Sequence, residues 1–284
     1  MTEKTAIRVR GLRKQYRDNM AVDGVDLDIA EGEIFALLGP NGAGKTTTVE
    51  ILEGYRRRDG GEVMVLGADP QRAPREWRYD LGIVLQTAGD LAELTLREAV
   101  HHFARYYPDP RDPDEVIDLV GLGEKATSLA RTLSGGQRRR LDVALGVVGK
   151  PRLLFLDEPT TGFDPAARRN FWALIRSLAD DHGTTILLTT HYLEEAEALA
   201  DRVAVIVAGR IVAEGDPATL GGRANAEAMV SWQDGTVPRS RRTSDPSAVI
   251  AELTKQYGGS VPGLTVTRPS LEDIYLDLIG STKA

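Results

Sequence analysis

Short apolar runs recur along the chain, and each one ends in polar or glycine-rich residues. The runs cover residues 34–38, 81–85, 153–156, 186–190 and 203–207. Runs of this length without polar alternation are typical of strands buried on both faces, as in a parallel sheet. Stretches with helical spacing lie between them, so the pattern predicts an α/β domain. Polar residues at the carboxyl ends of its strands would then lie where open α/β sheets bind ligands.

The stretch at about 88–150 has a helical pattern with two start signals. Thr95 and Glu98 have the spacing of a capping box. Asp112, Pro113 and Glu115 read as an N-cap, a first-turn proline and an acidic third residue. These signals predict a helical subdomain inserted between the runs at 81–85 and 153–156.

Residues 221–284 form a separate pattern, and we place a domain boundary between 220 and 221. The expected elements are a linker at 221–223, strands at 228–232 and 264–267, a helix at 246–257 and a last helix capped by Ser270 and Asp273. Residues 238–246 are polar, and Arg239, Arg241 and Arg242 predict a solvated loop there. The sequence thus predicts a small α/β extension after the main domain.

Composition limits the classes of protein that fit. The chain has 284 residues, a net charge of −7 and no cysteine, so it can bury one large core plus an appendage but has no disulfide framework. No apolar run approaches the ~18 residues of a membrane span, and the first ten residues lack the apolar region of a secretory signal. Any pore would lie in another polypeptide. The acidic balance argues against nonspecific nucleic-acid binding.

A glycine-rich run follows the apolar residues 34–38. It reads Gly39, Pro40, Asn41, Gly42, Ala43, Gly44, Lys45, Thr46 and Thr47, which fits G-x-x-x-x-G-K-[ST]. Glycines let backbone N–H groups approach a phosphate chain without a clashing Cβ. Lys45 supplies charge for the β- and γ-phosphates, Thr46 offers a hydroxyl to Mg²⁺, and the following helix points its positive end at the same anion. The run predicts a nucleotide site, in preference to a glycine-rich turn without a ligand.

Two further motifs follow in the chain. Leu133, Ser134, Gly135, Gly136 and Gln137 spell LSGGQ ahead of an apolar helical stretch. On its own, this sequence could be a turn that caps a helix. Asp157 and Glu158 end the run at 153–156, where a carboxylate pair can face a ligand; the alternative is a solvated acidic loop.

With these motifs in this order, residues 7–220 resemble the ATP-binding cassette (ABC) ATPases, whose signature motif is LSGGQ. The resemblance implies a P-loop NTPase fold for residues 1–220, with a RecA-like mixed sheet, an antiparallel β layer and the helical subdomain. It also implies ATP and Mg²⁺ as cofactors. Asp157 resembles the Walker B aspartate that holds Mg²⁺, and Glu158 the carboxylate that orients or deprotonates the attacking water.

The resemblance assigns four more residues. Gln86 is similar to the Q-loop glutamine that touches Mg²⁺ and water, and His191 to the switch histidine that contacts the γ-phosphate. Asp164 resembles the D-loop aspartate that couples two sites in a dimer, although Phe163 stands where the family more often has leucine. Tyr16 resembles the aromatic residue that stacks on adenine; packing in a strand is the alternative.

In this family two cassettes pack head to tail, and each ATP is held by the P-loop of one subunit and the LSGGQ of the other. The chain carries every motif, which implies a homodimer, with a heterodimer possible. The resemblance further implies an integral membrane permease as partner, no nucleic acid, and a peripheral place on the cytoplasmic face of the membrane.

The ending at 269–280 resembles that of ABC-2-type exporter ATPases, including multidrug subunits of the daunorubicin-resistance kind. The expected function is therefore an ATP-hydrolysing motor for a separate exporter of drugs or other amphipathic compounds. An importer ATPase and a soluble non-transport ABC protein are the alternatives. One P-loop, one LSGGQ and no long heptad coil between them argue against the soluble members.

Overall fold

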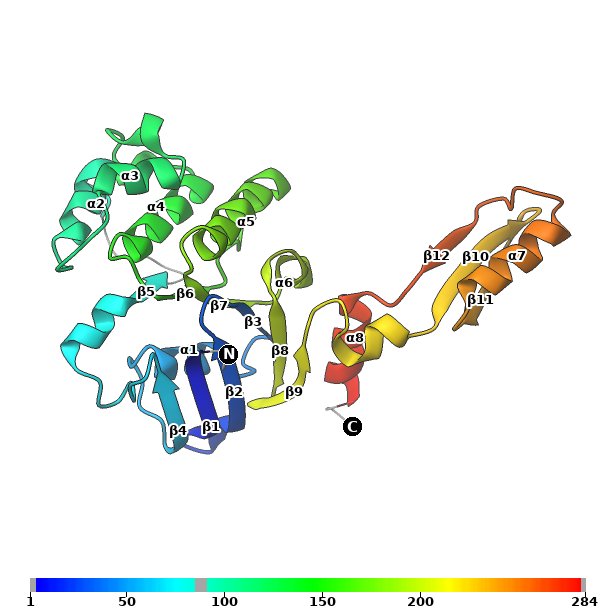
Figure 1. Cartoon of the computed structure of the whole chain (residues 1–284), viewed down its shortest axis with the longest axis horizontal. Coiled ribbons are helices and arrows are strands. Elements are labelled where there is room, and N and C mark those ends of the chain that lie inside the picture. Colours follow the sequence, from blue (N-terminus) through cyan, green and yellow to red (C-terminus); the bar gives the residue numbers. More distant parts are fainter. Residues whose placement is uncertain (1–3, 85–90, 282–284) are drawn as a thin grey trace. The chain divides into compact units, whose positions relative to one another are not determined.

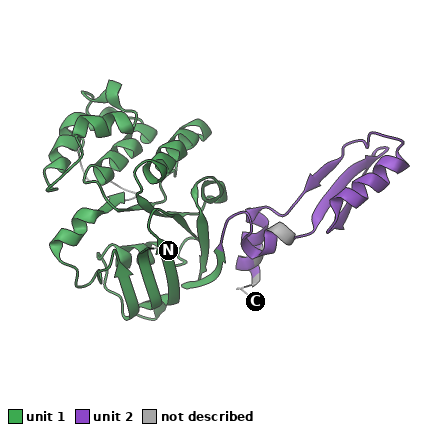
Figure 2. Cartoon of the chain, viewed as in Figure 1, with its two compact units in different colours: residues 1–214 green, residues 215–284 purple. Residues whose placement is uncertain are grey.

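The computed structural model describes residues 4–84 and 91–281. The chain divides into two compact units, residues 1–214 and residues 215–284 (Figure 2), whereas the sequence pattern predicts a boundary after residue 220. In the described residues, no helix is both long enough and apolar enough to cross a bilayer.

The first unit is built on a six-stranded sheet. Its strand order is β5 (Leu81–Val84), β6 (Leu153–Asp157), β7 (Thr185–Thr190), β3 (Ile34–Leu38), β8 (Arg202–Val207) and β9 (Arg210–Gly215). The pairs from β5 through β8 are all parallel, and β3, β6 and β7 are almost entirely buried. The continuous apolar runs therefore form the central parallel strands that they predicted.

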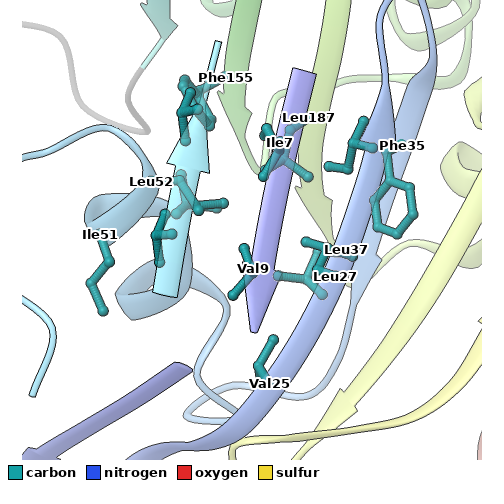
Figure 3. Close-up of a cluster of buried hydrophobic side chains, with 14 of the residues drawn as sticks. Ile7, Val9, Val25, Leu27, Phe35, Leu37, Ile51, Leu52, Phe155 and Leu187 are labelled. Carbon is teal, nitrogen blue, oxygen red and sulfur yellow. The ribbon is translucent and has the colours of Figure 1, made fainter. Parts of the chain in front are cut away.

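A three-stranded antiparallel sheet lies beside it. Its order is β2 (Asn19–Ala30), β1 (Thr5–Tyr16) and β4 (Gly60–Val65). Residues from its strands share one apolar cluster with the main sheet and with α1 (Lys45–Leu52) (Figure 3). The labelled members are Ile7, Val9, Val25, Leu27, Phe35, Leu37, Ile51, Leu52, Phe155 and Leu187. This cluster holds α1, the helix that follows residues 39–44, against the two sheets. Truncating a leucine to alanine in such a core lowers the free energy of unfolding by about 2–5 kcal/mol.

Helices α2 (Leu96–Ala104), α3 (Pro113–Leu119) and α4 (Gly135–Val147) form the expected helical subdomain between β5 and β6 (Figure 1). The Thr95–Glu98 capping box is present, and Asp112 caps α3 with Pro113 in its first turn. Two more helices, α5 (Pro165–Asp180) and α6 (Leu193–Leu199), follow β6 and β7.

The second unit contains a sheet in the order β11 (Val237–Thr243), β10 (Ala228–Asp234) and β12 (Thr265–Thr267), with helices α7 (Pro246–Gln256) and α8 (Leu271–Ser281). The expected loop at 238–246 is wrong for most of its length, because β11 pairs with the whole of β10 in an antiparallel hairpin. Gly235, at positive φ, lies in its turn. The strand is polar because its side chains are exposed, and the nearest apolar core lies under β10 and α7.

Residues 221–223 also differ from the expected linker. They lie in a packed turn, where a Cβ on Gly221 would come within 2.5 Å of the Ile274 side chain. Arg223 donates to the backbone carbonyls of Pro269 and Pro217, at 2.9 and 3.2 Å. This segment is therefore an integral part of the second unit.

Candidate functional site

Three strands of the main sheet end together at its carboxyl edge. Leu38 at the end of β3 is opposite Thr190 of β7, and Asp157 at the end of β6 is opposite Thr189. Parallel strands present their carboxyl ends to the same side. The register therefore brings the glycine-rich loop, the acidic pair at 157–158 and His191 to one place.

Glycine is needed in the loop at 39–44 for steric reasons. Gly44 has φ of 109°, and a Cβ there would lie 2.4 Å from the backbone oxygen of Ala21. A Cβ on Gly39 would lie 2.4 Å from the backbone oxygen of Ile206. Helix α1 begins at Lys45, directly after this loop, so its N-terminal N–H groups and positive dipole end are available to an anion.

Lys45 is buried at the mouth of the loop. Its Nζ donates to the carbonyl oxygen of Gly39 at 2.7 Å and lies 3.8 Å from Glu158 Oε1. Burial lowers the pKa of the Lys45 ammonium, while Glu158 and Asp157 oppose that shift. The ammonium is thus held by the loop and by acidic neighbours, in a position to meet a phosphate.

Glu158 lies between two basic groups. Besides its approach to Lys45, its Oε1 is 3.3 Å from His191 Nδ1. The His191 ring packs against that of Tyr192, with ring centroids 4.1 Å apart. The carboxylate and the imidazole are therefore close enough to act on the same water or phosphate oxygen.

The backbone of Glu158 is in the left-handed region, with φ of 44°. A residue with a Cβ adopts this conformation only when its surroundings hold it. Its N–H donates to the carbonyl oxygen of Thr189 at 3.1 Å, and the Thr189 hydroxyl donates to Asp157 Oδ1 at 2.5 Å. Thr189 therefore fixes both acidic residues, a role that the sequence reading did not assign.

Tyr16 lines the same pocket as the glycine-rich loop at 39–47, called the phosphate loop below. The pocket is bordered by Tyr16, Asn19, Ala21, Asn41, Gly42, Gly44, Lys45, Thr46, Thr47 and Glu158. Lys14 and Arg56 place their cationic groups 5.4 and 5.2 Å from the centre of the Tyr16 ring. An aromatic ring at the end of β1 thus lies beside the glycine-rich loop and Lys45, as stacking on the base of a nucleotide in this pocket would require.

The residues expected to hold Mg²⁺ are an exposed hydroxyl and a partly buried carboxylate, Thr46 and Asp157. Mg²⁺ prefers oxygen ligands and keeps several waters, so it needs few protein groups. The donor chemistry therefore fits the ion. Gln86, the third expected contact, lies outside the described residues.

The LSGGQ residues lie elsewhere on the same unit. Ser134 is the N-cap of α4 and forms a reciprocal capping box with Gln137. Together with Gly136, these residues line a cavity that also includes Arg140 and Asn170. Within the described residues, none of 133–137 borders the pocket at Lys45. Gly135 borders a different pocket, together with Glu158.

Asp164 caps α5, accepting from the N–H groups of Ala166 and Ala167 at 2.9 Å. Phe163 packs edge-on against Phe171, with centroids 5.6 Å apart. The phenylalanine at this position is therefore accommodated by an aromatic partner.

Several buried titratable residues near the site were not singled out by the sequence. Burial raises the pKa of Glu53, at the end of α1, to about 8, and that of Asp142, in α4, to about 6. Glu195 is fully buried on α6, and Arg139 is buried on α4. Helical periodicity could have placed Asp142 with the apolar face of α4, but it does not show what these groups touch.

Comparisons with known proteins agree with this geometry. Residues 22–161 match the ABC transporter family. The chain is 39% identical to the daunorubicin/doxorubicin resistance ATP-binding protein DrrA of Streptomyces peucetius, over 97% of this chain and 92% of that protein. It is 38% identical to the Nod factor export ATP-binding protein I of Rhizobium sp. (strain N33), over 98% of each.

Solved structures show the same fold. The cbiO1 protein of Clostridium perfringens, part of the ABC transporter complex cbiONQ, matches with a TM-score of 0.70 and 27% identity, over 76% of this chain and 90% of that one. An ATP-binding subunit of an ABC transporter matches with a TM-score of 0.71 and 23% identity, over 96% and 99%. The chain belongs to the ABC transporter family, as one of its ATP-binding cassette ATPases.

Proposed function

We propose that this chain is the ATP-hydrolysing subunit that drives a separate membrane-spanning exporter. The observation that carries the proposal is the meeting of Lys45, Glu158 and His191 beside the phosphate loop. The relatives that match over nearly the whole chain are named as resistance and export ATP-binding proteins. Because those two names give different cargoes, daunorubicin and Nod factor, the cargo is assigned only to the class of drugs or other amphipathic compounds.

The residues at the sheet edge have different roles in ATP hydrolysis. Lys45 and the N–H groups of the loop bind the β- and γ-phosphates of ATP. Glu158 orients the attacking water and accepts its proton, and His191 contacts the γ-phosphate. Thr46, Asp157 and Gln86 would hold Mg²⁺, which neutralises charge on the β- and γ-phosphates when bound.

The signature residues act on a second nucleotide. Ser134 and the N–H groups of Gly135 and Gly136 start a helix, so they can contact the γ-phosphate held by another subunit. Two copies packed head to tail then complete two sites, in a homodimer held together by ATP. Hydrolysis removes the shared phosphate and releases the dimer.

The membrane partner is an integral permease, for which we propose the ABC-2 type, and the dimer is peripheral on the cytoplasmic face. The relatives named for resistance and export support export over import. The named resistance and export relatives match 97–98% of the chain, and so share most of the second unit as well.

The test is recovery of the partner from native membranes. Glu158→Gln, tagged and loaded with ATP and Mg²⁺, should bring down an integral membrane protein in near-equal amount, because blocked hydrolysis preserves the closed dimer. Ser134→Arg, which cannot close, is the matched control and should recover less. Recovery of ribosomes or DNA instead, or of an importer permease with a substrate-binding protein, would contradict the proposal.

A further inference from the structure

Arg139 is a buried arginine that none of the motifs explains. It lies in the second turn of α4, the helix that begins at the signature residues, and it is 7% exposed. A buried guanidinium needs partners for its fixed fork of donors. The atoms to which Arg139 donates show which segment of the backbone it holds in place.

The guanidinium donates to the backbone on both sides of Glu158. Arg139 Nη2 donates to the carbonyl oxygen of Asp157 at 2.8 Å, and Nε donates to that of Pro159 at 3.1 Å. Glu158, with its left-handed backbone, is the residue between these carbonyls. Its own N–H is held from the other side by Thr189. The unusual conformation is therefore fixed by Arg139 and β7 together.

Acidic neighbours stabilise the buried cation. Arg139 Nη1 lies 3.9 Å from Asp142 Oδ2, one turn further along α4. Burial lowers the pKa of the Arg139 guanidinium, while the negative charges of Asp142, Asp157 and Glu195 oppose that shift. The guanidinium thus stays charged in the interior and keeps both carbonyl contacts.

We propose that Arg139 is a positioning residue for Glu158, and that it connects the signature helix to the carboxylate that orients water. The proposal rests on the proposed function. The signature end of α4 faces ATP on the partner subunit, whereas Glu158 acts on the ATP of its own subunit. Arg139 gives a direct path between them, so engagement of one nucleotide fixes the geometry at the other.

The test compares Arg139→Met with Arg139→Lys. Methionine keeps much of the length and apolar stem but no donor, so kcat for ATP hydrolysis should fall at least about tenfold, with KM and the Kd for ATP near those of the native protein. Lysine keeps the charge but lacks the fork, and should give an intermediate kcat. Arg223→Met is the matched control, since Arg223 also donates to two backbone carbonyls but lies in the second unit; it should retain kcat.

A double-mutant cycle separates positioning from general support of the fold. If Arg139 acts through Glu158, adding Arg139→Met to Glu158→Gln should slow hydrolysis no further. Additive losses, or a loss of ATP affinity that matches the loss of kcat, would overturn the inference. Thermal unfolding shows whether each variant folds, and Arg139→Lys serves if the methionine variant does not. A native protein without ATPase activity, or an unaffected Glu158→Gln, would instead refute the proposed function.

Discussion

Two surfaces of the first unit differ in the kind of groups they present: the phosphate-loop surface, made of residues 39–47, Glu158 and His191, and the signature surface, made of residues 133–137. The first is densely charged: the Nζ of buried Lys45 and the Nδ1 of His191 each lie within 4 Å of Oε1 of Glu158, whose backbone is left-handed. The second consists of a helix start with a serine cap, two glycines and a glutamine. The charged groups that we propose for binding and chemistry are therefore concentrated on the first surface, whereas the signature residues themselves present uncharged groups. This asymmetry fits the proposal that a complete ATP site needs both surfaces.

The largest effect should come from the carboxylate of the first surface. Glu158→Gln removes the base but keeps the shape, so we expect kcat to fall by about 10²–10⁴-fold, the usual contribution of general-base catalysis. ATP affinity should remain, and an ATP-bound dimer should accumulate, as size-exclusion chromatography with ATP can measure. Near-normal turnover would contradict the role of Glu158.

Lys45→Ala and Ser134→Arg, one on each surface, should differ in their effect on ATP binding. Loss of a charge-assisted contact of about 1.5–3 kcal/mol predicts an ATP Kd raised by about 10- to 100-fold. Ser134→Arg should leave the Kd of the isolated subunit unchanged, because residues 133–137 do not border the pocket at Lys45 among the described residues. Calorimetry measures the Kd for ATP of both variants. An equal rise in Kd for the two would contradict the description of two different surfaces.

Tyr16 gives a smaller effect, limited to the base. Loss of stacking in Tyr16→Ala should cost about 1–2 kcal/mol, which raises the Kd for ATP about tenfold. Tyr16→Phe keeps the ring and should bind ATP like the native protein. If the phenylalanine variant loses as much affinity as alanine, the ring does not act by stacking.

The buried acid Glu53, at the carboxyl end of α1, should affect stability rather than binding. Because the folded pKa of Glu53 is about 8 and its ordinary value 4.5, the folded state keeps the proton that the unfolded state releases. Stability therefore falls as pH rises from about 4.5 to 8, by at most about 5 kcal/mol. Glu53→Gln should flatten this fall and be more stable than the native protein at pH 8. Chemical unfolding at pH 5 and pH 8 measures the difference; an unchanged slope would show that Glu53 ionises normally.

The sequence predicted the central strands, the helical subdomain and the caps of α2, α3 and α8, because buried runs and caps such as Thr95 with Glu98 are local signals. Strand β11 was missed because it has no apolar alternation of its own. It is a strand because it pairs with β10. The charged groups at the sheet edge were predicted from motifs. Their supports, Arg139 and Thr189, were not, since contacts between residues 18 to 32 positions apart depend on packing.

The central claim is that each ATP site combines the phosphate loop of one copy with the signature of another. Lys45→Ala and Ser134→Arg should each be nearly inactive as ATPases alone. Mixed, they form heterodimers in which one site has both defects and the other has neither. At a 1:1 ratio half of the dimers are mixed, so we predict recovery of up to about a quarter of the native ATPase activity. Activity that stays at the average of the two separate variants would contradict the account.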